Sequence, residues 1–264
     1  MDGPSRRPDR SITVVPVTEG RAGEAAAHTS ICRGVDLYRL RLRYGRPLLD
    51  HAARLWAGVV LACCAVVVAV LGVIFAHQTA ADPFDRAVDS PVISGLGRRP
   101  GLAAWLAYPG SQRPAIALTA IIVVACLLTR RLNGAALAAA AVPVAVGVND
   151  RLCKPLFDRT YLGVLSYPSG HTATMFALAA ALVVLLYMPP KSVRVRVLRV
   201  VAWSAAGVAG TVVAVGVIGL QWHYFTDTIA GAAVGIGTVC ALALLLDLPT
   251  WLRRKSAAHV SAGA

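Results

Sequence analysis

Long apolar runs separated by short polar segments dominate the 264-residue chain. The first of them, Trp56 to Ala76, contains 21 uncharged residues and is long enough to cross a bilayer as a helix. Five further runs follow, so the pattern predicts an all-α membrane protein built as a bundle of six transmembrane helices. The predicted spans are residues 56–76, 114–129, 132–148, 172–188, 200–220 and 228–248.

The segments outside the membrane domain, residues 56–248, differ in composition. Residues 1–34 carry Pro, Gly, Ser and scattered charge without apolar periodicity, so we expect disorder there. Residues 35–55 form a basic juxtamembrane segment, which suits either binding to an anionic inner leaflet or a plain positive flank of the first span. Residues 102–108 are apolar but too short to cross, which favours an interfacial or re-entrant piece. Residues 249–264 form a basic tail.

The distribution of basic residues predicts the orientation. Six spans place both termini on one side, and 19 of the 26 Lys and Arg residues lie in segments on that side, against 7 on the other. By the positive-inside rule both termini are cytoplasmic. In a plasma membrane the loops 77–113, 151–171 and 221–227 would then face outward, and every polar group with chemical interest falls in or beside them.

Composition narrows the classes of function. Hydrophobic residues make up 57% of the chain, too many for an ordinary soluble domain. The net charge of +13 does not indicate nucleic-acid binding, because the basic residues cluster at the ends of apolar runs. The six cysteines show neither a disulfide framework nor the spacing of a metal site. We therefore expect no metal and no cofactor, and membrane lipids as the surroundings.

A turn at Ser169-Gly170-His171 leads directly into the fourth predicted span. A helix N-terminus offers unpaired N–H groups to an anion, and Gly170 allows close approach because it lacks a Cβ. Ser169 can cap the helix or donate to an oxygen, and His171 can move a proton near neutral pH. Taken alone, a serine cap with an interfacial histidine explains the turn equally well.

Two further pairs lie on the same face. Lys154 and Arg159 could clamp a phosphate, although a basic pair snorkelling to headgroups is the simpler explanation for the pair alone. His223 and Asp227 are spaced i, i+4, which places them on one face if the segment is helical. A carboxylate that accepts from one imidazole nitrogen leaves the other free as a nucleophile. Alone, this pair could equally cap the sixth helix.

Together the three groups match the requirements of phosphoryl transfer. The reaction needs donors and cations for the phosphate oxygens, a nucleophile opposite the leaving group, and a proton for the departing oxygen. Two histidines from different helices can divide the last two tasks. Because no carboxylate cluster suited to Mg²⁺ accompanies them in the sequence, a metal-free route is favoured.

The motifs Lys154…Arg159, Pro168-Ser169-Gly170-His171 and His223-Tyr224-Phe225-Thr226-Asp227 resemble the three signatures of the type 2 phosphatidic acid phosphatase (PAP2) superfamily, in its membrane lipid phosphatase branch. The resemblance spans about residues 115–248 and implies a six-helix phosphatase with an outward-facing site. It implies that His223 is the nucleophile, that Asp227 orients it and that His171 protonates the leaving oxygen. The phosphate oxygens would be held by Lys154, Arg159, Ser169 and Gly170.

Two departures from the family pattern reduce the number of cations. The first signature usually has Arg-Pro seven positions after its lysine, where Tyr161-Leu162 stand here. The third usually has Ser-Arg ahead of its histidine, where Gly216-Val217 stand. We expect Arg159 to substitute in the first signature. For the third, a cation from another outer loop would have to reach in, and the candidates are Arg98, Arg99, Arg113 and Arg151.

The sequence thus predicts a metal-independent integral membrane phosphatase that hydrolyses a lipid phosphate or pyrophosphate through a phosphohistidine at the outer membrane face. Polyprenyl pyrophosphates, phosphatidate and phosphatidylglycerol phosphate are the substrates that the resemblance implies. The alternatives are a lipid-linked phosphotransferase and a non-catalytic lipid-binding or transport protein that retains the fold. The oligomeric state is left open.

Overall fold

The computed structural model describes residues 47–187 and 193–262, with side chains for 47–187, 194 and 196–248. The predictions for residues 1–34 and for most of the basic segment 35–55 lie outside this part, as do the side chains of the basic tail. The helices are α2 (His51–Phe75), α3 (Pro83–Leu96), α4 (Pro100–Ala107), α5 (Gln112–Leu128), α6 (Leu132–Val148), α7 (Lys154–Phe157), α8 (Gly170–Leu186), α9 (Val193–Gly219) and α10 (Phe225–Ala262). A 3-10 turn (η1, Tyr108–Gly110), a π turn (η2, Asn149–Cys153) and the strands β1 (Thr160–Tyr161) and β2 (Val164–Leu165) complete the described elements.

Five helical segments of the described chain are long and apolar enough to cross a membrane. They are His51–Phe75, Pro100–Leu128, Leu132–Phe157, Arg196–Gly219 and Phe225–Leu248. The remaining predicted span, residues 172–188, corresponds to α8, which has only 17 residues. At 1.5 Å per residue α8 reaches about 26 Å, somewhat less than the hydrocarbon core of a bilayer. The described chain therefore has five helical segments of spanning length and one shorter apolar helix, and the predicted count of six spans is not confirmed.

The second span begins earlier than predicted. Residues 102–108 do not form a separate interfacial piece, because α4, η1 and α5 join into a nearly continuous helical segment from Pro100 to Leu128. Pro109 sits in the first turn of the 3-10 element, where a proline needs no N–H partner. Gly110 follows, and a Cβ there would lie 2.9 Å from the carbonyl oxygen of His171. The junction therefore brings α5 close to the start of α8.

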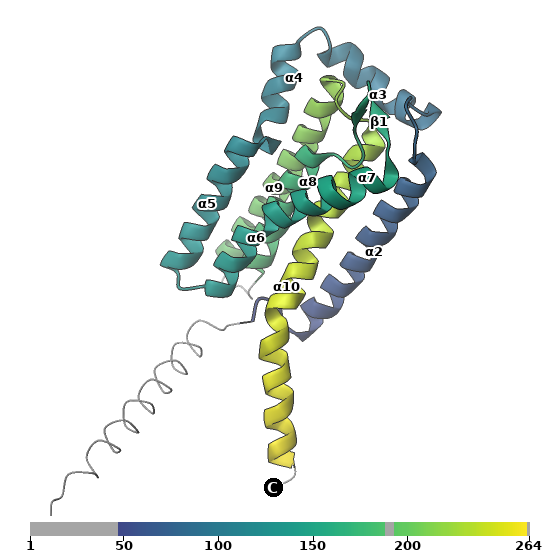
Figure 1. Ribbon diagram of the computed structural model, residues 1–264. Helices are drawn as coiled ribbons and strands as arrows, with labels where there is room; N and C mark the ends of the chain where they lie inside the picture. The colour runs from purple at the N-terminus through teal and green to yellow at the C-terminus, as the bar shows by residue number, and fades with distance from the viewer. Residues whose placement is uncertain (1–46, 188–192, 263–264) are drawn as a thin grey trace, which may run out of the picture. The chain divides into compact units, whose positions relative to one another are not determined.

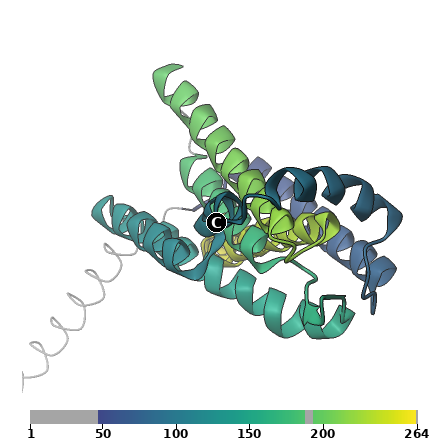
Figure 2. The ribbon, with the colours of Figure 1, turned by 90° about the horizontal axis from the view of Figure 1, so that it is seen from above.

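Helix α10 runs through the middle of the bundle, in contact with α2, α6 and α8 (Figures 1 and 2). Small residues allow the close approach of these helices. A Cβ at Gly231 would overlap the carbonyl oxygen of Ser169, and one at Gly235 would overlap that of Ala173. The first turn of α8 is therefore held against α10 by two glycines one helical turn apart. The main core includes six alanines of α6 and α8, together with Leu137, Val239 and Ala243.

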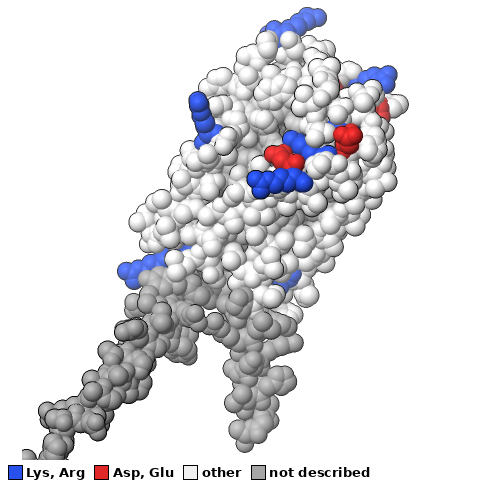
Figure 3. Space-filling view, in the orientation of Figure 1, with Lys and Arg blue, Asp and Glu red and all other residues white. Residues whose placement is uncertain are grey.

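The sides of the helices present large apolar residues to the surroundings. Val59, Val66 and Val73 of α2 and Val200 and Val208 of α9 are each at least half exposed. On the face drawn in Figure 3, most of the surface is uncharged, and the charged side chains form a few separate groups. Such a surface needs a hydrocarbon environment, because water would solvate it poorly.

One carboxylate lies near the end of the last predicted span. Asp247 is buried and accepts hydrogen bonds from the backbone N–H groups of Leu48 and Leu49, at 2.8 and 2.9 Å. Arg54 lies 3.3 Å from the same carboxylate. The carboxylate is therefore paired, and it fastens the start of α2 to α10 at the end of the bundle away from α3 and the strands (Figure 1).

Gly235→Ala should destabilise the protein, because the added methyl meets backbone atoms of α8 that cannot move independently of the helix. We expect a loss of about 1–3 kcal/mol, as in other overpacked sites. Gly207→Ala in α9 is the matched control, since no atom lies within 4 Å of the position that its added methyl would take. Unfolding followed in detergent should separate the two variants. Equal stability would contradict the close contact of α8 with α10.

Candidate active site

The segment before α8 is held by contacts with α2 and with the π turn η2. Ser166, Tyr167 and Ser169 are buried, and the peptide bond from Tyr167 to Pro168 is cis. The Tyr167 hydroxyl donates to the carbonyl oxygen of Val68 in α2 at 2.7 Å. The amide of Asn149, in the π turn after α6, donates to the carbonyl oxygen of Pro168 at 3.2 Å. These contacts set the position of the first turn of α8.

The backbone also links the second and third signatures directly. The N–H of Ser169 donates to the carbonyl oxygen of Asp227 at 3.0 Å, so this N–H is not available to an anion. The Ser169 hydroxyl is buried and has no hydrogen-bond partner, and it makes no capping bond to α8. The Cβ that a side chain at Gly170 would carry lies 3.6 Å from the Asn149 amide nitrogen. At the start of α8, Gly170 therefore lines the cavity, and the residue before it carries a buried, unpartnered hydroxyl.

His223 is oriented by a backbone carbonyl. Its Nδ1 lies 2.9 Å from the carbonyl oxygen of Ser166. Since a carbonyl only accepts, Nδ1 carries the proton and Nε2 holds the free electron pair. The expected hydrogen bond to Asp227 is not made, because the nearest carboxylate oxygen is 3.8 Å away. The reason is that α10 begins only at Phe225, so His223 precedes the helix and the i, i+4 geometry does not apply.

Arg159 occupies a buried ion cluster behind the histidine. Its guanidinium donates to Asp227 at 2.7 Å, to Asp85 of α3 at 2.5 Å and to the Thr226 hydroxyl at 2.7 Å. Asp85 also accepts from the N–H and the hydroxyl of Thr226, both at 2.9 Å. Arg159, Asp85 and Asp227 are fully buried. The expected phosphate ligand is therefore already bonded to two carboxylates, which favours a role in positioning.

Two aromatic rings enclose the same guanidinium. Its central carbon lies 4.5 Å from the ring centre of Phe75 and 4.3 Å from that of Tyr224, within the range of cation–π attraction. The ring of Tyr161 also lies against that of Tyr224, with centres 4.5 Å apart and the ring planes tilted by 48°. Burial raises the pKa of Tyr224 to about 12, and burial also raises the pKa of Tyr161. Both phenols therefore remain neutral around pH 7.

Helix α3 contributes acidic groups that the sequence motifs do not include. Burial raises the pKa of Asp85 above its ordinary value despite its bonds to Arg159 and Thr226. One turn later, burial and the neighbouring Asp85 raise the pKa of Asp89 to about 7. The spacing of Asp85 and Asp89 after the capping residue Asp82 is visible in the sequence as one acidic helix face. That spacing does not indicate that Asp85 pairs with Arg159, 74 positions later in the chain.

The π turn η2 places the first-signature lysine. Lys154 pairs with Asp150 at 2.8 Å, and both side chains line a cavity of about 1400 Å³. Arg151 also lines it, whereas Arg98, Arg99 and Arg113, which are likewise described, do not. Of the four arginines considered as replacements, Arg151 is thus the one at the cavity.

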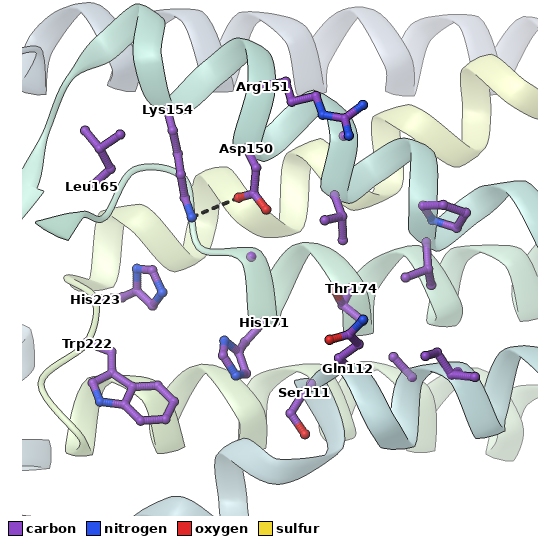
Figure 4. Close-up of a pocket in the computed structure, with 18 of the residues that line it drawn as sticks. Ser111, Gln112, Asp150, Arg151, Lys154, Leu165, His171, Thr174, Trp222 and His223 are labelled. Carbon is purple, nitrogen blue, oxygen red and sulfur yellow. Dashed lines mark ion pairs between the residues drawn. The ribbon is translucent and has the colours of Figure 1, made fainter.

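His171 and His223 line the same cavity together with Gly170 and Lys154. Figure 4 shows the two imidazole rings side by side, with the Lys154 side chain reaching toward His223. The His171 ring also lies against Trp222, with ring centres 5.4 Å apart. From this polar end the cavity continues between α5 and α6 along apolar residues, including Ile116, Val123, Ala139, Val142 and Val146.

The predicted residues thus fall into two groups. Lys154, Gly170, His171 and His223 line the cavity. Arg159 and Asp227 lie behind it in the ion cluster, and Ser169 is buried and does not line the cavity either. Sequence reasoning missed Asp85, Asn149, Ser166 and Trp222, which orient the others through contacts between segments far apart in the chain.

The two departures from the family pattern have physical explanations. Tyr161 lines the cavity where the family arginine was expected and stacks on Tyr224. Val217 is fully buried in α9. A Cβ at Gly216 would lie 2.5 Å from the backbone nitrogen of Ala107, so the closely packed α4 leaves no room for a side chain there.

The structure and the site define a helical membrane protein with a two-histidine cavity at one end of its bundle. The family model of the PAP2 superfamily matches residues 113–251, and the chain belongs to this superfamily. No curated protein matches the sequence. Among solved structures, a transmembrane PAP2 type phosphatidylglycerolphosphate phosphatase from Bacillus subtilis is similar in fold, with a TM-score of 0.58 and 16% sequence identity. The match covers 69% of this chain and 93% of that one.

Arg159→Met should lower the free energy of unfolding by about 3–5 kcal/mol, because it leaves two buried carboxylates without their cation. Adding Asp85→Asn should recover part of that loss, since one buried charge is then removed. Arg98→Met, at an exposed position, is the control and should change stability by less than about 0.5 kcal/mol. Denaturant unfolding in detergent measures all three. Full stability of Arg159→Met with weakened binding of inorganic phosphate would support the ligand role instead.

Proposed function

We propose that the protein hydrolyses a lipid phosphate or pyrophosphate, without a metal, through a phosphohistidine at the outer face of the plasma membrane. The observation that carries the proposal is the convergence of His171, His223 and Lys154 on one cavity that has a polar end and an apolar arm. Membership of the PAP2 superfamily supports phosphate chemistry. The similar fold of a phosphatase that acts on a phospholipid supports a lipid substrate.

In the first step, Nε2 of His223 attacks phosphorus and the bond from phosphorus to the lipid oxygen breaks. The proton on Nδ1, held by the Ser166 carbonyl, keeps the electron pair of Nε2 available. His171, from the start of α8, gives a proton to the departing oxygen. In the second step a water molecule attacks the phosphohistidine, His171 takes the proton of that water, and inorganic phosphate leaves.

The phosphate oxygens would be bound by Lys154, by the Ser169 hydroxyl and by the free N–H groups at the start of α8. Lys154 is paired with Asp150 and can turn its ammonium toward a phosphate, since the group has three donors. The Ser169 hydroxyl is buried without a partner, so a bound oxygen would satisfy it. Arg159 acts behind this set by fixing Asp227, whose carbonyl oxygen holds the N–H of Ser169.

The metal-free route rests on the chemistry of the donor set. Within the described residues, no group of three or more His, Cys, Asp and Glu side chains is arranged to hold a metal ion. Asp150, which lines the cavity, is paired with Lys154, and Asp85 and Asp227, which lie behind it, are paired with Arg159. Two imidazoles and a lysine can supply the nucleophile, the proton and the positive charge. Hydrolysis that persists in EDTA is the corresponding expectation.

The apolar arm supports a substrate with a hydrocarbon chain. The cavity follows α5 from Ala115 to Val123, a distance of about 12 Å at 1.5 Å per residue. An apolar arm of this length between two membrane helices suits one lipid chain and would leave a soluble sugar phosphate without contacts. Which lipid is preferred depends on the chain and headgroup that fit between the two ends.

His223→Ala should lower kcat by a factor of about 10⁴ or more, and His171→Ala by a factor of about 10² to 10⁴. The control is His77→Ala, because His77 is an exposed histidine paired with Asp158 and does not line the cavity. Phosphate release by purified protein should be measured with phosphatidate, phosphatidylglycerol phosphate and polyprenyl pyrophosphates. Unchanged activity of His223→Ala would contradict the mechanism. Transfer of phosphate to an added alcohol at the expense of water would favour the phosphotransferase alternative.

The outward orientation predicts that a cysteine at Leu165, in the exposed strand β2, reacts with a membrane-impermeant maleimide in intact cells. The matched position is Thr129, exposed at the turn between α5 and α6 at the opposite end of the bundle. A cysteine there should react only after permeabilisation. Labelling of the unaltered protein measures the background reaction of the native cysteines with the maleimide. The reverse pattern would place the site on the cytoplasmic side.

A further inference from the structure

A short hairpin stands over the polar end of the cavity. Strand β1 pairs with β2 in antiparallel fashion, with Thr160 opposite Leu165 and Tyr161 opposite Val164. The two turn residues, Leu162 and Gly163, both have positive φ, 49° and 81°. Two-residue hairpin turns of this kind favour Asn-Gly or Asp-Gly, because side chains other than Asn and Asp are strained there. Gly163 suits its position and Leu162 does not.

Leu162 is unfavourable for a second reason. Its side chain is 83% exposed, and the neighbouring Val164 is 70% exposed, so within the described chain the tip buries little apolar surface. A leucine that is strained in the backbone and exposed in the side chain does not stabilise the fold. Both residues nevertheless line the cavity that contains His171 and His223.

The base of the hairpin is held rigidly, so the position of the tip is defined. The N–H of Thr160 donates to the carbonyl oxygen of Gln78 at 3.0 Å, and the N–H of Ser166 donates to that of Arg159 at 2.9 Å. Tyr161 stacks on Tyr224, and Arg159 enters the buried ion cluster. The carbonyl of Ser166, at the same base, orients His223. The tip is therefore fixed relative to the nucleophile.

We propose that the hairpin tip, Leu162 and Val164, binds the hydrocarbon chain of the lipid substrate where the chain leaves the phosphate, and so selects substrates by chain. This inference rests on the proposed function. The occupant is the substrate chain because the tip lines the same cavity as the histidines, and that cavity continues into an apolar arm. The competing explanation is that the tip contacts the lipids of the surrounding bilayer. An assay in detergent micelles, which contain no bilayer, distinguishes the two explanations.

The test is Leu162→Asn. Asparagine tolerates positive φ, so this variant should fold at least as stably as the unaltered protein while it removes the apolar side chain. The matched control is Leu156→Asn in α7, because Leu156 is also exposed but does not line the cavity. Two pairs of probes are used in detergent micelles: dioleoyl with dihexanoyl phosphatidate, and geranylgeranyl with dimethylallyl pyrophosphate.

For the long-chain member of the hydrolysed pair, KM should rise about 3- to 10-fold in Leu162→Asn, as expected for loss of one apolar contact, with kcat unchanged. For the short-chain member KM should change less than about twofold, and Leu156→Asn should change neither. The inference would be overturned if KM in Leu162→Asn changed equally for both chain lengths or for neither. It would also be overturned if the effect occurred in vesicles and was absent in micelles. Failure of the unaltered protein to hydrolyse any of the four would instead overturn the proposed function, and this inference with it.

Discussion

The buried guanidinium of Arg159 is the constraint on which the rest of the site depends. It joins Asp85 of α3 to Asp227 of α10 and lies between Phe75 at the end of α2 and Tyr224. A desolvated arginine is stable only when its charge and its donors are matched, and two carboxylates and a hydroxyl supply this. Four segments far apart in the sequence are therefore required to meet at one point. The hairpin that follows Arg159 and the start of α10 take their positions from it.

This arrangement changes how the phosphate would be bound. The arginine closest to the expected first-signature position is used inside the protein, Tyr161 stands at the cavity in its place, and the third-signature position is the buried Val217. Within the described part, Lys154 and Arg151 are the cations that line the cavity, and Asp150 is paired with Lys154. The site therefore has fewer cations and more apolar wall than the family pattern implies, which favours selection by the hydrocarbon chain over selection by charge.

The sequence predicted the features that depend on local pattern. Apolar runs located the helices, and residue spacing located His171, His223 and Lys154, which meet at the cavity. It did not predict the partner of Arg159, because Asp85 lies 74 positions earlier and only the fold brings the two together. It also assigned the orientation of His223 to a side chain, whereas the Ser166 carbonyl, 57 positions away, provides it. Pattern alone did not define helix lengths and junctions, as the short α8 and the joined α4 and α5 show.

Nε2 of His223 is the proposed nucleophile, and rapid-quench trapping during turnover tests this most directly. Protein mixed with a ³²P-labelled lipid phosphate that it hydrolyses, stopped in alkali and digested, should yield one labelled peptide that contains His223, with the label stable to base and lost in acid. The label should accumulate further in His171→Ala, because His171 is the proposed base for hydrolysis of the intermediate. Label on another residue, or turnover at the native rate with no labelled peptide, would contradict the account.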